Sequence, residues 1–341
     1  MVPGGSEQRR QRNGMRVIVT GIGGFIGYHV ARALLARGWT VVGVDNLVPY
    51  YSVQLKRDRL EELARFRPFE FNELDISDLT AADAFFSRHS YATHVVHLAA
   101  QPGVRYSLEN PAAYIQANVT GQLAVLEGVR KLGQLRHVLY ASSSSVYGAN
   151  TKVPFSVEDR VTSPVSVYAA SKLAAEHLAE TYGHLYRLPL TGLRFFTVYG
   201  PWGRPDMAPY KFATQILAGE TIAVYNNGDM ARDFTYIDDI VQGVVLGMDK
   251  PPAPNAFGST HRVYNLGNNR PTPLLRFISV LEQALGRKAH MRLEPMQPGE
   301  VKETFADITE TARDFGFAPQ TPIEDGIPRF VAWLKAYHRA G

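Results

Sequence analysis

The sequence predicts an α/β protein with a doubly wound parallel sheet and a smaller, interleaved domain in its C-terminal part. Two observations carry this prediction. Strand-like and helix-like segments alternate through the first two-thirds of the chain, which is the pattern of a parallel sheet covered by helices. A glycine-rich turn at residues 21–27 joins a short apolar run to a helical pattern, as in a phosphate-binding loop.

The individual elements follow from local patterns. The β-branched run 16–20 suits a buried parallel strand, and 28–35 has helical periodicity that stops at Gly38. The second strand, 40–45, ends in an acid. Further strands are expected at 69–71, 94–98, 137–141 and 190–194, a late strand at 263–266 should rejoin the sheet, and helices fit 111–131, 167–186 and 208–218.

A change in composition after residues 199–202 suggests the domain division. After Pro201 and Trp202, Pro, Gly and Asp become frequent and the strand–helix rhythm breaks. We expect a disordered tail at 1–14, a dinucleotide-binding Rossmann domain at 15–195 that includes the late strand, and a substrate-binding domain at 196–341.

Overall composition excludes several classes of protein. With 45% hydrophobic and 20% charged residues among 341, the chain has an ordinary globular composition. The absence of cysteine excludes disulfides and thiolate metal sites, and we expect no bound metal. No apolar run is long enough to span a membrane, and no apolar segment follows the basic tail as in a signal peptide. A net charge of +4 suits an anionic substrate better than a nucleic acid, so we expect a cytoplasmic enzyme with neither membrane nor nucleic-acid partners.

The glycine turn predicts a dinucleotide site. Its spacing is Gly-x-x-Gly-x-x-Gly, and the backbone there could approach a pyrophosphate at the start of a helix. The residues expected to bind are Gly21, Gly24, Phe25, Ile26 and Gly27. The alternative is a plain glycine turn between strand and helix.

The acid at the end of the second strand selects the cofactor. Asp45 would grip the adenosine 2′-hydroxyl and repel a 2′-phosphate, so NAD is favoured over NADP, with Asn46 assisting.

Two later strand ends contribute further candidates. Asp75 with Ile76 would contact the adenine, although Asp75 could instead be a helix N-cap. Small residues after the fourth strand would let the backbone approach the ribose; this segment is Leu98, Ala99 and Ala100. His94 and His97 lack metal-ligand spacing and are expected in the core.

A serine run and a tyrosine–lysine pair predict the chemistry. Tyr168 and Lys172 are four residues apart and share one face of the helix expected at 167–186. Free tyrosine has a pKa near 10, so its ionisation at pH 7 requires roughly 4 kcal/mol of stabilisation. The lysine ammonium and a cationic nicotinamide would supply it, and a serine hydroxyl from 142–145 would bridge substrate and tyrosine. This combination is typical of carbon–oxygen redox chemistry.

Together these motifs resemble the extended short-chain dehydrogenase/reductase family, and within it the UDP-glucuronate 4-epimerases. The resemblance covers nearly the whole chain after residue 14 and is carried by residues 101–107, 141–148 and 194–207. It implies that Tyr168 is the catalytic base, Lys172 its activator and ribose ligand, and Ser143 the bridging hydroxyl. It makes 196–341 a UDP-sugar-binding domain and 111–131 and 167–186 the interface of a homodimer.

The resemblance also implies substrate contacts. Arg204, Arg232 and Glu300 would bind UDP, and Arg270 or Arg292 would supply a second phosphate contact. Hydroxyls would hold the sugar carboxylate. The remaining expected substrate residues are Gln101, Arg105, Ser144, Ser145 and Thr197.

Positions 144 and 145 discriminate among related reactions. Sequences that resemble the related dehydratases and decarboxylases have an acidic residue at these positions, whereas this chain has serines. The implied reaction is the epimerisation of UDP-glucuronate at C4 to UDP-galacturonate, through a 4-keto intermediate and with tightly bound NAD that is not consumed. The alternatives are a UDP-glucuronate decarboxylase, another NAD-dependent UDP-sugar 4-epimerase, and a non-catalytic NAD-binding regulator.

Overall fold

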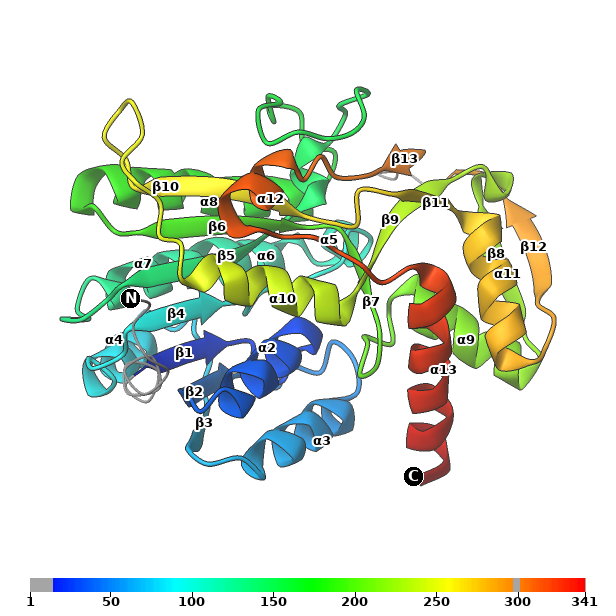
Figure 1. Ribbon diagram of the computed structural model, residues 1–341, viewed down its shortest axis with the longest axis horizontal. Helices are drawn as coiled ribbons and strands as arrows, with labels where there is room; N and C mark the ends of the chain where they lie inside the picture. Colours follow the sequence, from blue (N-terminus) through cyan, green and yellow to red (C-terminus); the bar gives the residue numbers. More distant parts are fainter. Residues whose placement is uncertain (1–14, 297–300, 341) are drawn as a thin grey trace, which may run out of the picture.

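A seven-stranded parallel sheet forms the centre of the computed structural model, which describes residues 15–296 and 301–340 (Figure 1). The strand order is β10-β6-β5-β4-β1-β2-β3. The strands are β1 Arg16–Thr20, β2 Thr40–Asp45, β3 Phe69–Glu73, β4 His94–His97, β5 His137–Ser143, β6 Leu190–Phe195 and β10 His261–Leu266. The order reverses between β1 and β4, and ligands of such sheets bind in the crevice at the carboxyl ends of these strands.

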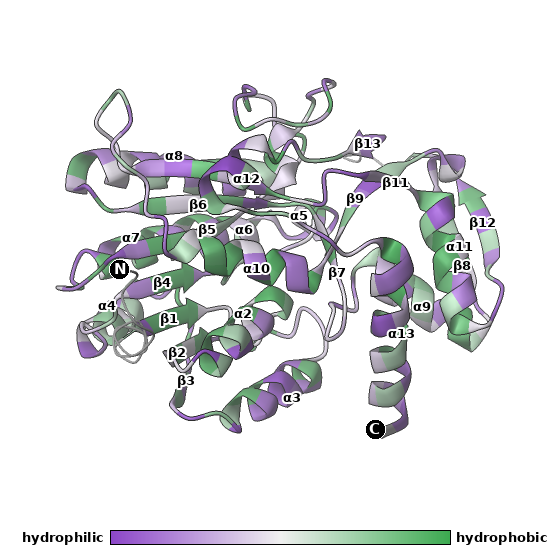
Figure 2. Cartoon of the chain, in the orientation of Figure 1, coloured by the Kyte–Doolittle hydropathy of each residue, from purple (hydrophilic) through white to green (hydrophobic). Residues whose placement is uncertain are grey.

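Helices cover both faces of this sheet. Alternate residues of β1 belong to different apolar clusters: Val17 and Val19 pack with α2 and α10, whereas Ile18 packs with α4 and α7. Figure 2 shows β1 and β2 as hydrophobic strands and α3 as a largely hydrophilic outer helix. The helices are α2 Phe25–Ala36, α3 Val53–Ala64, α4 Leu79–Arg88, α7 Gly121–Val129, α8 Val167–Tyr186 and α10 Ile237–Met248.

The predicted helices and the late strand can be compared directly with the structure. Helices α8 and α9 (Ala208–Ala218) confirm the predictions 167–186 and 208–218. β10 pairs in parallel with β6, so the prediction that a late strand rejoins the sheet is also confirmed. The helix predicted at 111–131 is instead composite: α6 (Pro111–Tyr114) leads into a π-helical turn, η1 (Ile115–Thr120), and then α7, which ends at Val129.

A second group of elements lies at the carboxyl end of the main sheet (Figure 1). β9 (Ala231–Tyr236) pairs with β7 (Thr197–Tyr199), β11 (Pro271–Pro273) and β13 (Glu303–Thr304), while β8 (Thr221–Tyr225) pairs with β12 (His290–Glu294). The remaining elements are α5 Tyr106–Glu109, η2 Ser144–Tyr147, η3 Asn226–Gly228, α11 Leu274–Leu285, α12 Thr309–Phe315 and α13 Ile323–Ala340. Because α10 and β10 return to the main sheet between these elements, the two parts are interleaved.

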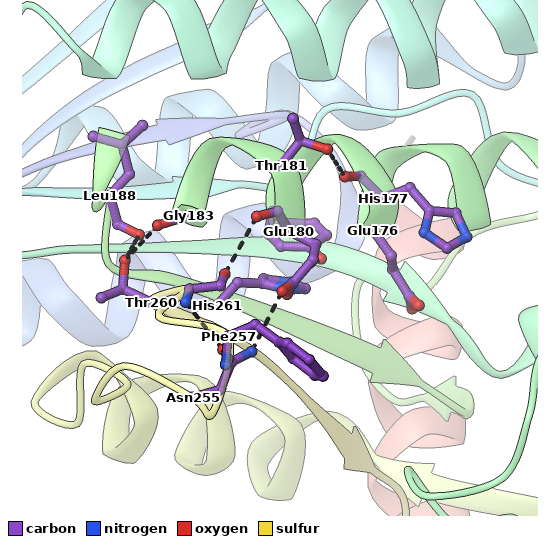
Figure 3. Close-up of polar contacts among 12 residues, drawn as sticks. Glu176, His177, Glu180, Thr181, Gly183, Leu188, Asn255, Phe257, Thr260 and His261 are labelled. Atoms are coloured by element: carbon purple, nitrogen blue, oxygen red, sulfur yellow. Dashed lines mark hydrogen bonds and ion pairs between the residues drawn. The ribbon is translucent and has the colours of Figure 1, made fainter. Parts of the chain in front are cut away.

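Polar contacts fasten α8 to the returning strand β10 (Figure 3). The Glu180 carboxylate contacts His261 Nδ1 at 2.8 Å, and His261 Nε2 lies 2.8 Å from the Tyr140 hydroxyl. Thr260 donates its hydroxyl hydrogen to the Leu188 carbonyl oxygen. These contacts fix the helix that carries the tyrosine–lysine pair against the edge of the sheet. None of the helices in the described ranges is both long and apolar enough to span a membrane.

Candidate active site

A cavity of about 1010 Å³ opens at the carboxyl ends of the central strands and is lined by residues of both parts of the chain. The glycine turn, the start of α2 and the end of β2 form one wall. The segments after β4 and β5, with the first turns of α8, form the floor. Residues of β7, β8, β9 and α9 form the opposite wall.

The glycine turn packs closely against the segment that follows β4. Gly21 has φ +70°, and a Cβ atom there would lie 2.6 Å from the Ala99 nitrogen. A Cβ at Gly27 would lie 2.2 Å from the Gly21 carbonyl oxygen. Only glycine fits at these two positions. The predicted residues Gly21, Gly24, Phe25, Ile26, Gly27, Leu98, Ala99 and Ala100 all line the cavity. The first turn of α2 thus borders the cavity, which fits a pyrophosphate at a helix N-terminus.

Asp45 is buried at the end of β2 and also lines the cavity. Its carboxylate accepts hydrogen bonds from the backbone N–H groups of Gly23 at 3.0 Å and Leu47 at 2.8 Å. Lys56 Nζ lies 3.6 Å from the same carboxylate and is itself buried. Lys56 is a cavity residue that sequence reasoning missed, because no local motif links a lysine of α3 to the end of β2.

The structure decides between the two interpretations of Asp75 only in part. The N-cap of α4 is Asp78, which accepts from the N–H groups of Thr80 and Ala81, so the N-cap interpretation of Asp75 is wrong. Asp75 lines the cavity with Asn46 and Ile76. Burial raises the pKa of the Asp75 carboxyl, but hydrogen bonds from Ser77 and Asn46 outweigh it and leave that pKa below its ordinary value. An acceptor at this point of the wall fits an adenine amino group.

The tyrosine–lysine pair lies on the cavity floor. Helix α8 begins after Ser166, whose hydroxyl oxygen accepts the Ala169 N–H at 3.1 Å, so both side chains project from its first turns. Lys172 Nζ donates to the Ala141 carbonyl oxygen at 2.9 Å. Burial lowers the pKa of Lys172 to about 8, and the nearby Glu176 carboxylate opposes this shift. Burial raises the pKa of Tyr168, against a hydrogen bond with Ser143 and the positive charge of Arg204.

A buried ion pair links α8 to β6 next to the tyrosine–lysine pair. Arg194 of β6 donates two hydrogen bonds to the Glu176 carboxylate, at 2.9 and 2.8 Å, and the Ser142 hydroxyl donates to the same group at 2.5 Å. Sequence reasoning missed Glu176, although it continues the four-residue spacing of Tyr168 and Lys172 along one face of α8.

The hydroxyl residues cluster next to this floor. Ser143 ends β5, and its hydroxyl oxygen accepts the Ser145 N–H at 3.2 Å. Ser144 and Ser145 lie in the single turn η2, and Thr197 begins β7. All four residues line the cavity, so the structure brings the predicted hydroxyls together.

Several of the predicted cations line the cavity. Arg204 forms a bidentate pair with Asp206, at 3.0 and 2.5 Å. The Arg105 guanidinium lies 4.6 Å from the centre of the Tyr225 ring. Arg232 donates to the carbonyl oxygens of Ala231 and Lys302. These three arginines and Gln101 line the cavity, whereas Glu300 falls outside the described residues.

Only one of the two candidates for a second phosphate contact lines the cavity in the described part of the chain. Arg292 lines the cavity, while Arg270 is not among its lining residues in the described part of the chain. Lys211 of α9 lines it as well, and sequence reasoning missed it.

The two histidines of β4 lie in the core. His97 Nδ1 lies 2.6 Å from the Thr20 hydroxyl, and burial lowers the pKa of His97 to about 3 and that of His94 to about 4. Within residues 15–296 and 301–340, no cluster of three or more His, Asp or Glu side chains could hold a metal ion.

Comparison with known proteins identifies the family. Residues 17–267 match the NAD dependent epimerase/dehydratase family. This chain belongs to that family. It is 46% identical to UDP-glucuronate 4-epimerase 2 of Arabidopsis thaliana, over 98% of this chain and 79% of that protein. It is 44% identical to the probable UDP-glucuronate 4-epimerase of Rhizobium meliloti, over 95% of this chain and 98% of that protein.

A solved structure confirms the predicted fold class. The UDP-glucuronic acid 4-epimerase of Bacillus cereus, in complex with UDP-glucuronic acid and NAD, superposes with a TM-score of 0.86 at 32% identity. The match covers 95% of this chain and all of that one. The resemblance inferred from the motifs is therefore confirmed at the level of the family and the fold.

Proposed function

We propose that this protein is an NAD-dependent UDP-glucuronate 4-epimerase, which interconverts UDP-glucuronate and UDP-galacturonate. The observation that carries the proposal is that one cavity joins a dinucleotide cradle, a tyrosine–lysine pair, a cluster of hydroxyls and several cations. The three relatives named above carry the same activity in their names.

The cradle fits NAD. Gly21 and Gly27 bring the backbone close to the start of α2, and Asp45 is held at the end of β2 where an adenosine ribose would lie. Bound NAD would supply a reversible hydride acceptor for C4 of the sugar. We propose that Asn46, Asp75 and Ile76 contact the adenosine, and that the segment 98–100 borders the ribose.

Proton transfer at the C4 hydroxyl is assigned to Tyr168. Its phenolate would take the hydroxyl proton during oxidation and return it during reduction. The Lys172 ammonium stabilises the phenolate, and Ser143, which shares a hydrogen bond with Tyr168, would hold the sugar hydroxyl. C4 is first oxidised and then reduced again, and the hydride and the proton both return to the sugar. The reaction therefore consumes no acid, base or cofactor.

The hydroxyl cluster would protect the sugar carboxylate. The 4-keto sugar is a β-keto acid, which loses CO2 when the C5–C6 bond aligns with the π-system of the keto group, because the electrons of that bond pass into the carbonyl. Ser144, Ser145 and Thr197 would hold the carboxylate out of that alignment. A hydrogen bond to a charged group contributes about 1.5–3 kcal/mol, so two or three would slow decarboxylation by orders of magnitude.

The opposite wall would hold the nucleotide. A diphosphate requires cations, and Arg204, Arg232 and Arg292 line this wall. Gln101 and Arg105 would close over the sugar, and Glu300 is proposed for the uridine ribose from the family resemblance. We propose the division into a cofactor part, 15–195 with the late strand, and a UDP-sugar part, 196–341, on this basis.

A homodimer is proposed through α7 and α8. These helices pack against each other, and apolar side chains are exposed nearby: Ile115 of η1, which leads into α7, is 50% exposed, and Leu185 near the end of α8 is 60% exposed. Light scattering should show twice the monomer mass, and Ile115→Glu should shift the population towards monomer. The cytoplasmic location stays a prediction.

Product analysis tests the proposed reaction. Purified enzyme with UDP-glucuronate should give UDP-galacturonate, identified by chromatography and by NMR of the C4 proton, without added NAD. UDP-glucose is the matched control, because it differs only at C6, where a hydroxymethyl group replaces the carboxylate, and it should react much more slowly. A UDP-pentose released with CO2, or conversion of UDP-glucose alone, would contradict the proposal.

A further inference from the structure

Arg59 of α3 is a buried cation that forms no ion pair with an acidic side chain of residues 15–296 or 301–340. Its side chain is 0% exposed. Its guanidinium donates four hydrogen bonds, all to uncharged oxygens: the carbonyls of Gly23 at 2.8 Å, Trp202 at 2.5 Å and Gly203 at 3.2 Å, and the Tyr51 hydroxyl at 2.8 Å. Its Nε atom has no partner within the described residues. Removing a guanidinium from water without pairing it with a carboxylate is costly.

The contacts of Arg59 join the two halves of the candidate active site. Gly23 lies in the glycine turn of the dinucleotide cradle. Trp202 and Gly203 directly precede Arg204, the cation proposed for UDP. A single guanidinium therefore holds both ligand-binding segments, which are far apart in the sequence.

The second segment is strained and needs such support. Trp202 has φ +59°, a left-handed conformation that an aromatic residue rarely adopts. Its ring packs against Tyr28 of α2, Trp333 and Tyr337 of α13. His29 Nε2 of α2 also lies 2.9 Å from the Pro201 carbonyl oxygen. The glycine turn and the 201–204 segment thus form one packed unit with Arg59 at its centre.

We propose that Arg59 is a positioning residue that couples the two subsites, so that a nucleotide diphosphate bound at Arg204 strengthens retention of the dinucleotide at the glycine turn. This inference rests on the proposed placement of the two ligands. Each ligand orders one side of the shared unit, and the second then binds to a segment already held in place. The buried positive charge also favours anions on both sides.

The coupling can be measured on the holoenzyme with UDP as the probe. The rate of NAD release is followed at a temperature just below unfolding, with and without saturating UDP. Wild-type enzyme should release NAD at least about tenfold more slowly when UDP is present. Arg59→Met should abolish this protection and raise the dissociation constant of UDP. The matched control, Arg57→Met, changes an exposed arginine of the same helix and should retain the protection.

A second variant keeps the test decisive if Arg59→Met does not fold. Arg59→Lys retains the charge but cannot span the Gly23 and Trp202 carbonyls together, so it should fold and lose most of the protection. Protection equal to wild type in a folded Arg59 variant, or no effect of UDP on wild-type enzyme, would overturn the inference. These readouts need no turnover, so failure of the enzyme to epimerise UDP-glucuronate would refute the proposed function and leave the coupling intact.

Discussion

Tyr168 and Lys172 show how burial opposes the charges that catalysis needs. Burial raises the pKa of Tyr168 and lowers that of Lys172 to about 8, so each shift favours the neutral form. The Glu176 carboxylate opposes the shift of Lys172, and Arg204 opposes that of Tyr168. Ionising Tyr168 while Lys172 stays protonated therefore depends on neighbouring charges, and a shared helix face alone does not achieve it.

Replacing the base tests this assignment. Tyr168→Phe keeps the ring packing and removes the proton acceptor. We expect turnover of UDP-glucuronate to fall at least about a thousandfold, in the upper range for one acid–base group, while the dissociation constant of UDP-glucuronate changes little. Steady-state kinetics and calorimetric titration measure the two quantities. Near-normal turnover would show that another group transfers the proton.

Removing the Glu176 charge should move the pH profile. Glu176 raises the pKa of Lys172, so Glu176→Gln should lower that pKa below about 8. Lys172 would then lose its proton at a lower pH, and the alkaline limb of kcat/KM should shift towards neutral pH. Circular dichroism must show a folded variant, because Arg194 loses its charged partner. An unchanged alkaline limb in a folded variant would argue against control by Lys172.

Removing hydroxyls tests the protection of the carboxylate. Thr197→Ala, or Ser144 and Ser145 both changed to Ala, should leave oxidation possible because Tyr168 and Lys172 remain. Once the carboxylate is no longer held, the C5–C6 bond can align with the keto π-system, so more CO2 and UDP-4-keto-pentose should form per epimerisation. Released CO2 and product NMR give the ratio. Loss of epimerisation without a rise in CO2 would mean that the hydroxyls do not protect the carboxylate.

At this scale, sequence reasoning found residues with a local signature. The serine run, the tyrosine–lysine pair and the glycines could be located because their spacing is short. Lys56, Glu176 and Arg59 were missed because their partners are distant in sequence: Arg59 contacts Gly23 and Trp202 only after α3 packs beside α2.

Among the elements, β2 and α3 together set the cofactor preference. Asp45→Ala removes the acceptor for a ribose hydroxyl and leaves Lys56 without its acidic partner. The variant should bind NAD more weakly and discriminate less against NADP, because the freed ammonium favours a 2′-phosphate. Nucleotide released on denaturation after dialysis, and competition between NAD and NADP, measure this. Unchanged NAD content and preference would contradict the role of Asp45.

Element boundaries were predictable where local signals end a helix. Helix α8 begins at the Ser166 cap, and α9 ends at Gly219, whose φ is +76°. The π-helical turn η1 was not predictable. Its Asn118 side chain bonds the backbone of Gln101 and the Ser171 hydroxyl, which are tertiary contacts that no local pattern reveals.

For the whole molecule, four buried histidines predict acid sensitivity. Burial lowers the pKa of His29 and His97 to about 3, and that of His94 and His137 to about 4. These groups are neutral in the folded chain and bind protons after unfolding, so their contribution to stability is present above pH 6.5 and is lost as the pH falls from there towards 3. The loss should reach roughly 5 kcal/mol per pH unit at its steepest.

Urea unfolding at several pH values measures this slope. His97→Gln should flatten the fall in unfolding free energy between pH 6.5 and 4.5, in contrast to the same change at exposed His177. An equal slope in the His97 variant would mean that other groups cause the acid sensitivity.

The overall architecture was predictable from the alternation of strands and helices, including the return of 263–266 to the sheet. The small sheets were not, because β9 gathers β7, β11 and β13 from distant parts of the chain and each partner is very short. The cavity between the two parts likewise depends on how they are interleaved.

The central claim is that C4 is oxidised and reduced within one active site. The most direct measurement is the fate of the C4 hydrogen, with UDP-glucuronate deuterated at C4 and incubated with the enzyme in ordinary water. The product UDP-galacturonate should retain the deuterium at C4, as shown by NMR and mass spectrometry, because the hydride is held in the site and returned. Loss of the deuterium to solvent would indicate proton abstraction from carbon and contradict the proposed chemistry.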